Sequence, residues 1–223
     1  KATHEAKRAT SWLAPDQEYD ERVRAFAEAV LADAAFLADL GGFVDALLPA
    51  ARTAALARQV LKLTAPGRPD IYQGTELWTD SLVDPDNRRP VDYDARRRVV
   101  GELGDEPPPP DDPIGRSKLF VTRRLLALRR QRPEAFDGAV DALTVEGVAS
   151  EHAVAFARGG EIAVCVPRFP LRLTDEGGWR DTTIALPPGS WTEVFTGVRQ
   201  HGTVALTGLL GGFPVGVLER VER

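Results

Sequence analysis

The spacing of apolar residues changes near residue 137, and this change constrains the fold more than any other feature. Before it, apolar residues recur at helical intervals, as in residues 119–128. After it, short apolar runs such as 162–166 are separated by glycine or proline pairs, as β-strands are. The sequence therefore predicts an α+β chain, with a helical, strand-poor part at 1–136 and an antiparallel β-sandwich at 137–223.

The helical part contains several segments with clear start and stop signals. Asp16 begins a helix whose apolar stripe is interrupted by Gly41 and Gly42, and Pro66 with Gly67 ends the next one. The remaining elements expected here are a short strand at 69–72 and helices at 94–101 and 115–131. The side chains of the last helix that are expected to face the core are Leu119, Val121, Leu125, Leu126 and Leu128. The strands of the second part are expected at 139–140, 153–156, 162–166, 182–186, 191–195, 204–206 and 215–218.

Charge and composition exclude several classes of function. The chain carries 28 Lys and Arg against 33 Asp and Glu, a formal net charge of −5. Without a basic excess, neither nucleic acid nor an anionic membrane surface is an expected partner. No apolar run in the sequence approaches the roughly 18–20 residues of a membrane span. A cytoplasmic location is therefore expected.

The residues that hold metals and disulfides are sparse. Cys165 is the single cysteine and lies in a run typical of a buried strand, so we expect an inert core thiol in a reducing compartment. His4, His152 and His201 lie far apart in the sequence and lack the spacing of metal ligands. The sequence predicts no metal site and no cofactor. It also contains no methionine, even at position 1, which favours a piece of a longer protein.

A long irregular segment, 73–93, comes after the expected strand and concentrates polar side chains of several kinds. It has the sequence QGTELWTDSLVDPDNRRPVDY. Carboxylates, amides and guanidinium groups are the donors and acceptors that recognise sugar hydroxyls. Such a loop favours the wall of a polar binding site.

The motifs around this loop resemble the α-amylase superfamily. The pattern PGxPxxYxGxE at 66–76 resembles its eighth-strand segment, and DPDNR at 84–88 resembles the segment directly after that strand. More narrowly, the chain is similar to the C-terminal part of the maltooligosyltrehalose synthases, the glucan isomerases of that superfamily. That similarity rests on EAK at 5–7 with TSW at 10–12, LKLTAPG at 61–67, PDIYQGTELW at 69–78 and SLVDPDNRRPVDY at 81–93.

The resemblance implies a fold and a reaction. Residues 1–136 would be the helices and last strand of a (β/α)8 barrel, with the loop at 73–93 facing the active site. The implied reaction converts the reducing-end α-1,4 linkage of a maltooligosaccharide into an α,α-1,1 linkage, with retention. Its carboxylates would lie upstream, so no catalytic residue is expected in this chain. The implied partners are a maltooligosaccharide and the missing N-terminal part of the enzyme.

The loop supplies the candidate site. Residues predicted to bind substrate are Gln73, Glu76, Trp78, Asp84, Asp86, Asn87 and Arg88. A purely structural alternative stays open: residues 84–87 are typical of a type I turn, and Arg88 and Arg89 would brace the loop by pairing with aspartates. Glu5, in a stretch that superficially resembles a catalytic segment of the superfamily, is expected to be a surface helix residue.

Two other functions fit the same residues. The chain could belong to another α-glucan hydrolase or transglycosylase, or it could be a non-catalytic carbohydrate-binding module centred on the β-sandwich. The sequence upstream of Lys1 would distinguish the first of these, and binding of maltopentaose by the β part alone would favour the second.

Overall fold

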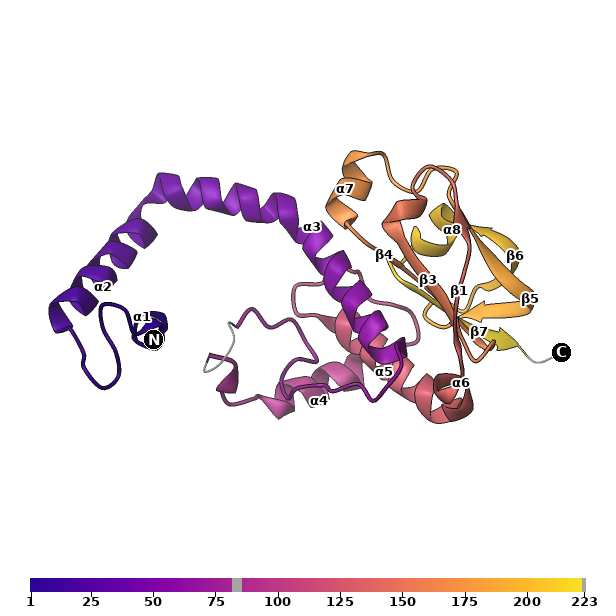
Figure 1. Cartoon of the computed structure of the whole chain (residues 1–223), viewed down its shortest axis with the longest axis horizontal. Helices are drawn as coiled ribbons and strands as arrows, with labels where there is room; N and C mark the ends of the chain where they lie inside the picture. The colour runs from indigo at the N-terminus through magenta and orange to yellow at the C-terminus, as the bar shows by residue number, and fades with distance from the viewer. Residues whose placement is uncertain (82–85, 222–223) are drawn as a thin grey trace. The chain divides into compact units, whose positions relative to one another are not determined.

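The computed structural model describes residues 1–81 and 86–221, and the chain divides into two compact units, Lys1–Leu47 and Leu48–Arg223 (Figure 1). The first unit contains helix α1 (Ala2–Ala6), helix α2 (Gln17–Ala32) and the beginning of helix α3 (Ala34–Thr64). Asp16 caps α2, since its carboxylate accepts a hydrogen bond from the N–H of Tyr19 at 2.9 Å.

The predicted helix break at Gly41 and Gly42 is wrong. Helix α3 runs through both glycines and through Pro49, and the break lies earlier, at Asp33. Asp33 is extended, and its carboxylate accepts from the N–H groups of Ala35 and Phe36 at 2.9 and 3.1 Å. A side chain that caps a new helix thus outweighs two glycines, which a helix tolerates at a modest cost.

The first unit buries very little of its apolar surface. Among its described residues, Thr10 alone is buried, and Phe26 is 71% exposed. Helix α3 is also long and apolar enough to cross a membrane by length and composition alone. Its most apolar 18-residue window has a mean hydropathy of 1.5, and none of that window is buried. The expectation that the sequence contains no segment of this length and apolarity is therefore wrong. Alanine and glycine, rather than a continuous run of large apolar side chains, extend the segment without adding charge.

In the second unit, helices α4 (Tyr93–Glu102) and α5 (Arg116–Gln131) agree closely with the predictions, whereas α6 (Pro133–Asp137) was not predicted. Helix α3, which precedes them, ends at Thr64, just before Pro66 and Gly67. In α5 the predicted inward residues are buried except Leu126, which is 42% exposed. Val121, Leu125 and Leu128 already fill the inward stripe, and Leu126 lies about 100° around the helix from Leu125.

The predicted strand at 69–72 does not form. Strand structure requires a hydrogen-bonded neighbour, and every strand of the described sheet lies between Val140 and Val221. The segment is irregular and leads into the turn at 73–76. The remnant of a barrel strand thus stays an interpretation of the motif.

The β part is one antiparallel sheet rather than two packed sheets. Its strands are β1 (Val140–Ala142), β2 (Val145–Glu146), β3 (Ala153–Arg158), β4 (Ile162–Pro167), β5 (Thr183–Glu193), β6 (Arg199–Ala205) and β7 (Gly216–Val221). Their order is β1-β3-β4-β7-β5-β2, with β6 also paired to β5. Strand β5 causes the departure from a sandwich, because it joins the strands expected at 182–186 and 191–195 into one, with a register shift between Ala185 and Ser190.

Strand β4 explains how the sheet and the helices form one core. All of its residues are buried, and its two faces enter different apolar clusters. Ile162, Val164 and Val166 pack in a cluster with residues of α3 and α5, among them Leu56 and Phe120. Ala163 and Cys165 face Trp191, Val204 and Leu206. Burial raises the pKa of Cys165 to about 12, as expected of an unreactive core thiol.

Residues from the helices before position 137 and from the sheet after it therefore belong to the same hydrophobic core. The core that joins them extends from Leu56 to Val217. Short helices α7 (Pro170–Asp175) and α8 (Leu206–Leu210) and the 3-10 helix η2 (Ser150–His152) also belong to this unit. The boundary between a barrel part at 1–136 and a β part at 137–223 stays a prediction.

Candidate functional site

The loop that carries the predicted site encloses a cavity of about 310 Å³. Small-molecule sites usually start near this size, at roughly 300 Å³. It is lined by Tyr72, Gln73, Gly74, Thr75, Thr79, Ser81, Asn87, Arg89, Pro90, Val91, Asp92 and Arg96. Residues from both ends of the loop thus line the same cavity.

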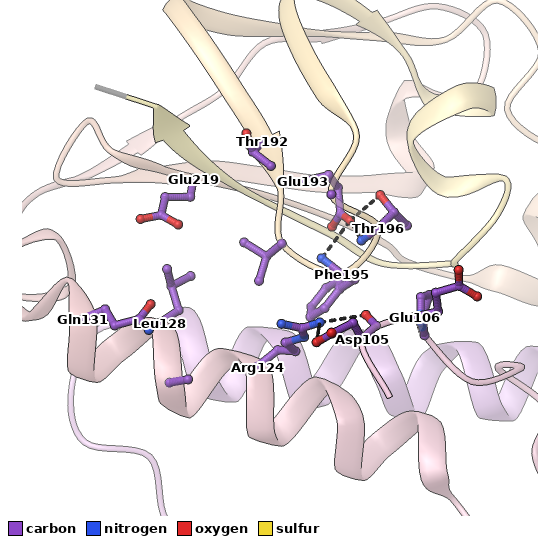
Figure 2. Close-up of a pocket in the computed structure, with 14 residues that line it drawn as sticks. Asp105, Glu106, Arg124, Leu128, Gln131, Thr192, Glu193, Phe195, Thr196 and Glu219 are labelled. Carbon is purple, nitrogen blue, oxygen red and sulfur yellow. Dashed lines mark hydrogen bonds and ion pairs between the residues drawn. The ribbon is translucent and has the colours of Figure 1, made fainter. Parts of the chain in front are cut away.

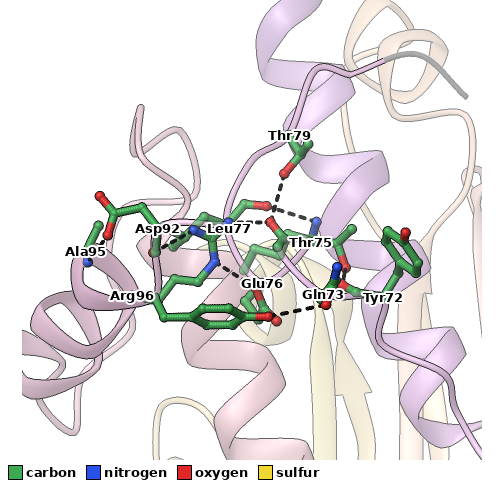
Figure 3. Close-up of polar contacts among 12 residues, drawn as sticks. Tyr72, Gln73, Thr75, Glu76, Leu77, Thr79, Asp92, Ala95 and Arg96 are labelled. Atoms are coloured by element: carbon green, nitrogen blue, oxygen red, sulfur yellow. Dashed lines mark hydrogen bonds and ion pairs between the residues drawn. The ribbon is translucent and has the colours of Figure 1, made fainter. Parts of the chain in front are cut away.

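Arg96 of α4 holds the beginning of the loop against its end (Figure 3). Its Nε donates to Glu76 Oε2 at 2.9 Å, and its remaining nitrogens donate to the carbonyl oxygens of Gly74 at 2.5 Å and Asp92 at 3.0 Å. Asp92 in turn caps α4 by accepting from the N–H of Ala95 at 2.8 Å. One guanidinium therefore connects segments about twenty residues apart in the sequence.

The first turn of the loop requires a glycine at position 74. Gly74 has φ +88°, and a Cβ there would lie 3.0 Å from Val91 Cγ2. Its carbonyl oxygen also accepts from Thr79 Oγ1 at 3.0 Å, while Thr75 Oγ1 donates to the carbonyl of Tyr72 at 2.6 Å. The turn is thus defined by its own short-range hydrogen bonds.

Two of the predicted binding residues, Gln73 and Asn87, line the cavity with amide groups. Both side chains are exposed, and Gln73 Oε1 accepts from the hydroxyl of Tyr93 at 3.4 Å. Each amide offers both a donor and an acceptor, as recognition of a sugar hydroxyl requires.

Two other predicted residues have internal partners. Glu76 is paired with Arg96, as described above. Trp78 donates its indole N–H to the carbonyl of Asp112 at 2.7 Å, and the guanidinium of Arg52 lies 4.3 Å from the centre of its ring. These contacts favour a scaffold role for both side chains.

The remaining predicted residues lie at or beside the part of the loop that the structure leaves undescribed. Asp84 lies outside the described residues, as does most of the expected turn at 84–87. The backbone of Asp86 forms, with Asn87 and Arg88, the 3-10 helix η1 (Asp86–Arg88). Arg88 is exposed there and does not contribute to the lining of the cavity. Its role as a substrate contact stays a prediction.

The sequence did not single out Arg96, which lines the cavity, or Tyr93, which bonds to Gln73. Arg96 stands beside two other arginines in the sequence, Arg97 and Arg98, yet its side chain is only 19% exposed. A signal was present: Asp92 is a helix N-cap residue, and the residue four positions later lies one turn above it, facing the same loop.

A second cavity, of about 430 Å³, lies between α5 and strands β5 and β7 (Figure 2). Its most buried polar group, Glu193, is 2% exposed and accepts hydrogen bonds from Phe195 N, Thr196 N, Thr196 Oγ1 and Val217 N at 2.6–3.2 Å. Burial raises the pKa of Glu193, and these hydrogen bonds act against that rise. Since all four donors come from the turn after β5 and from β7, the carboxylate organises the sheet itself.

A third cluster joins Glu151, His152 and Glu176, whose ligand-type atoms all lie within 4.8 Å of one another. His152 is buried, and its Nε2 lies 3.0 Å from Glu176 Oε2. Arg172 bridges both carboxylates, at 3.2 Å from Glu151 and 2.7 Å from Glu176. The guanidinium supplies the positive charge that the carboxylates need, so the cluster is an ion-pair network. The spacing of the histidines in the sequence did not indicate this cluster.

Comparison with known proteins identifies close relatives. No family model matches the chain. Proteins of two Mycobacterium tuberculosis strains, both described as a maltooligosyl trehalose synthase, are 42% identical to it over 221 residues. The match covers 99% of this chain but only 27% of the relatives. The chain therefore spans about a quarter of their length.

Solved structures give the same result. Maltooligosyltrehalose synthase from Arthrobacter ramosus matches at 38% identity with a TM-score of 0.91, covering 99% of this chain and 29% of that one. A second crystal structure of a maltooligosyl trehalose synthase matches at 29% identity with a TM-score of 0.75, again covering 99% and 29%. The resemblance carried by the loop motifs is thus confirmed: along nearly its whole length, the chain matches the C-terminal part of the maltooligosyltrehalose synthases.

Proposed function

We propose that this chain is part of an enzyme that isomerises the reducing-end α-1,4 linkage of maltooligosaccharides to an α,α-1,1 linkage. The observation that carries the proposal is the similarity to maltooligosyltrehalose synthases over 99% of the chain, in sequence and in fold. The mechanism would be a retaining intramolecular transglucosylation, with the freed glucose re-attached through its own anomeric hydroxyl.

In this proposal the loop cavity holds the glucose that is released and then re-attached. Gln73 and Asn87 would position its hydroxyls, while Arg96 and Glu76 keep the wall rigid. A fixed polar wall favours reattachment over hydrolysis, because it orients the freed sugar and displaces water. Asp84, Asp86 and Arg88 stay predicted substrate contacts outside the described lining of this cavity.

The carboxylates that perform the chemistry would lie in the remaining part of the polypeptide. The exposed apolar surface of the first unit supports such a partner, because large exposed apolar patches usually mark interaction sites. Among the described residues of that unit, apolar side chains exposed on α2 and α3 include Val23, Phe26, Leu31, Phe36, Leu37, Leu40, Phe43 and Val44. We infer a cytoplasmic enzyme in which the rest of the protein, rather than a membrane, covers this surface.

A chimera tests the proposal directly. The matching C-terminal part of the Arthrobacter ramosus synthase would be replaced by this chain, since the two folds agree with a TM-score of 0.91. With maltopentaose, the chimera is expected to form a product with a non-reducing α,α-1,1 end, detected by loss of reducing sugar and by NMR. The chain alone is expected to form none.

Two results would contradict the proposal. A chimera that unfolds at the temperature of the parent enzyme yet releases only glucose would show that this chain does not support re-attachment of the freed glucose. Formation of the isomerised product by the chain alone would show that catalytic carboxylates lie within these residues.

The loop residues are tested in the same chimera. Asn87→Ala should lower kcat/KM about tenfold or more, since it would remove hydrogen bonds to the freed glucose. The prediction that Arg88 also contacts the sugar implies a similar loss in Arg88→Ala. Arg97→Ala is the matched control, because Arg97 pairs with Asp94 on the exposed face of α4. Unchanged kinetics in Arg88→Ala would leave that arginine a structural role only.

A further inference from the structure

Phe169 has a backbone conformation that its own packing does not explain. It adopts φ 51° and ψ 53°, the left-handed region, immediately before Pro170 at the start of α7. For a bulky residue this conformation is an outlier that costs free energy. Phe169 is nevertheless 55% exposed, so its burial within the described residues does not offset that cost. Such outliers cluster at binding sites.

Two side chains contact the ring of Phe169, one on its face and one at its edge. The guanidinium of Arg168 lies 4.4 Å from the ring centre, and His152 meets the ring edge-on with centroids 6.5 Å apart. His152 is itself fixed by Glu176, and Arg172 joins α7 to Glu151 and Glu176. A ring with these contacts is a pre-organised surface, which lowers the entropy lost on binding.

A groove of about 400 Å³ lies beside the ring. It is lined by Ala50, Phe169, Pro170, Leu171, Arg172 and Asp175. Apolar side chains form most of this lining, while Arg172 and Asp175 add a cation and a carboxylate. The side chain of Asp175 forms no hydrogen bond or ion pair within the part of the chain that the structure describes.

We propose that this groove is an accessory binding site for an α-1,4-glucan chain, separate from the loop cavity. The C–H face of a glucose unit would stack on the ring of Phe169, on the side opposite Arg168. Hydroxyls of the same or the next unit would donate to Asp175 and accept from Arg172. The choice of an α-glucan rests on the proposed function, while the existence of a binding surface rests on the exposed and strained ring.

The two cavities share none of the residues that line them. The accessory site would therefore hold a distant part of a long substrate, or a polymer, without touching the reacting linkage. Its contribution should grow with the number of glucose units and should vanish for chains too short to reach it.

Calorimetric titration of the whole chain with maltoheptaose tests the proposal. Phe169→Ala and Asp175→Asn should each raise Kd about tenfold or more, and Phe169→Tyr should bind as the parent does. Phe169→Gly is the decisive variant, because glycine relieves the left-handed strain while removing the ring. It should unfold at an equal or higher temperature and still lose binding, which separates loss of the site from loss of the fold.

Phe26→Ala is the matched control, since Phe26 is another exposed phenylalanine that lines a different apolar groove. Equal weakening in Phe26→Ala would indicate non-specific apolar binding and would overturn the proposal. Absence of binding by the parent chain, or unchanged binding in Phe169→Gly, would overturn it as well. None of these results bears on isomerisation, which the chimera tests by its product.

Discussion

At the scale of single residues, the loop cavity depends on a few side chains that replace regular hydrogen bonding. Residues 72–92 contain no paired strand in their described part, so their backbone groups must find other partners. Arg96 satisfies two carbonyl groups and the carboxylate of Glu76, while Gly74 makes the turn sterically possible. The contributions of Arg96 and of Gly74 can be measured by separate substitutions.

Arg96→Ala should lower the free energy of unfolding by about 1–3 kcal/mol, because it leaves Glu76 partly buried without its cation. Cleavage of the loop by protease should accelerate as well. Arg97→Ala, which breaks an ion pair whose side chains are 77% and 78% exposed, should cost less than about 0.5 kcal/mol. Denaturant titration of both variants measures the difference, and equal losses would show that Arg96 does not hold the loop.

Gly74→Ala should destabilise the loop through two effects, a left-handed φ of +88° and a contact of 3.0 Å with Val91. We expect a loss of about 1–2 kcal/mol. Gly160→Ala isolates the first effect, since Gly160 has φ +69° with no atom within 4 Å of the added carbon. If both variants unfold at the same denaturant concentration, close packing against Val91 plays no part.

At the scale of secondary-structure elements, a buried aspartate, Asp112, organises the turn that leads into α5. Asp112 is buried, and one of its oxygens accepts from the N–H groups of Ile114, Gly115 and Arg116 at 2.6–3.0 Å. Arg116 pairs with the other oxygen at 3.0 Å. Burial raises the pKa of Asp112, but the hydrogen bonds and charge of Arg116 outweigh it, so the pKa lies below its ordinary value.

This lowered pKa predicts how stability depends on pH. A carboxylate whose pKa is lower in the folded state stabilises the fold fully above its unfolded value of 3.8, and loses that contribution as pH falls toward the folded value. Asp112→Ala should therefore cost about 1–2 kcal/mol at pH 7. The difference from the parent chain should shrink below pH 3.8. Urea titrations at pH 7 and pH 3 measure it.

Asp92→Ala serves as the control for Asp112→Ala. Asp92 also caps a helix, but it is exposed, and its carboxylate accepts one hydrogen bond from the helix backbone. The donor is the N–H of Ala95, at 2.8 Å. We expect a smaller cost, about 0.5–1 kcal/mol. A loss in Asp92→Ala as large as in Asp112→Ala would show that burial of the cap adds nothing.

Strand β5 shows why element boundaries were harder to predict than elements. Pro187, Pro188 and Gly189 are typical turn residues, yet they lie inside the 11-residue strand, at the register shift. The strand can continue there because β6 pairs with it on both sides of the shift, while β7 pairs only beyond it. Local signals cannot report such pairing, since the partners lie elsewhere in the sequence.

At the scale of the whole molecule, the two units differ in how much apolar surface they bury. The second unit has a continuous core that includes Phe120, Phe195 and Phe213. The first unit presents an apolar groove formed by α2 and α3, lined in part by Phe26 and Phe36. A surface of this kind promotes association with other chains.

We expect the chain alone to self-associate, as measured by sedimentation velocity. Combined replacement of Phe26, Phe36 and Phe43 by serine should restore a monomer and leave the unfolding temperature nearly unchanged, because these rings are 71%, 43% and 62% exposed. In the chimera, the same replacements should instead weaken the enzyme, since the rest of the polypeptide would cover this surface. A monomeric parent chain would contradict the prediction.

The candidate site shows how far the sequence could predict chemistry. It directed attention to the loop, where Gln73 and Asn87 line one cavity, and their role in binding stays a prediction. It could not show that Glu76 and Trp78 have internal partners, Arg96 and the carbonyl of Asp112, because these contacts join residues 20 and 34 positions apart. The groove at Phe169 had no sequence signal, since a left-handed phenylalanine cannot be recognised from its neighbours.

The sequence by itself determined the kinds of element and their relatives: the helices α4 and α5, the buried strands β3 and β4, and the loop motifs shared with maltooligosyltrehalose synthases. These depend on local periodicity, capping and residue identity. Only the tertiary structure decided that the helix break lies at Asp33, that the strands form one sheet, and that Arg96 closes the loop. Those features depend on which distant groups meet, and the free energy of such contacts exceeds the small local preferences that a sequence displays.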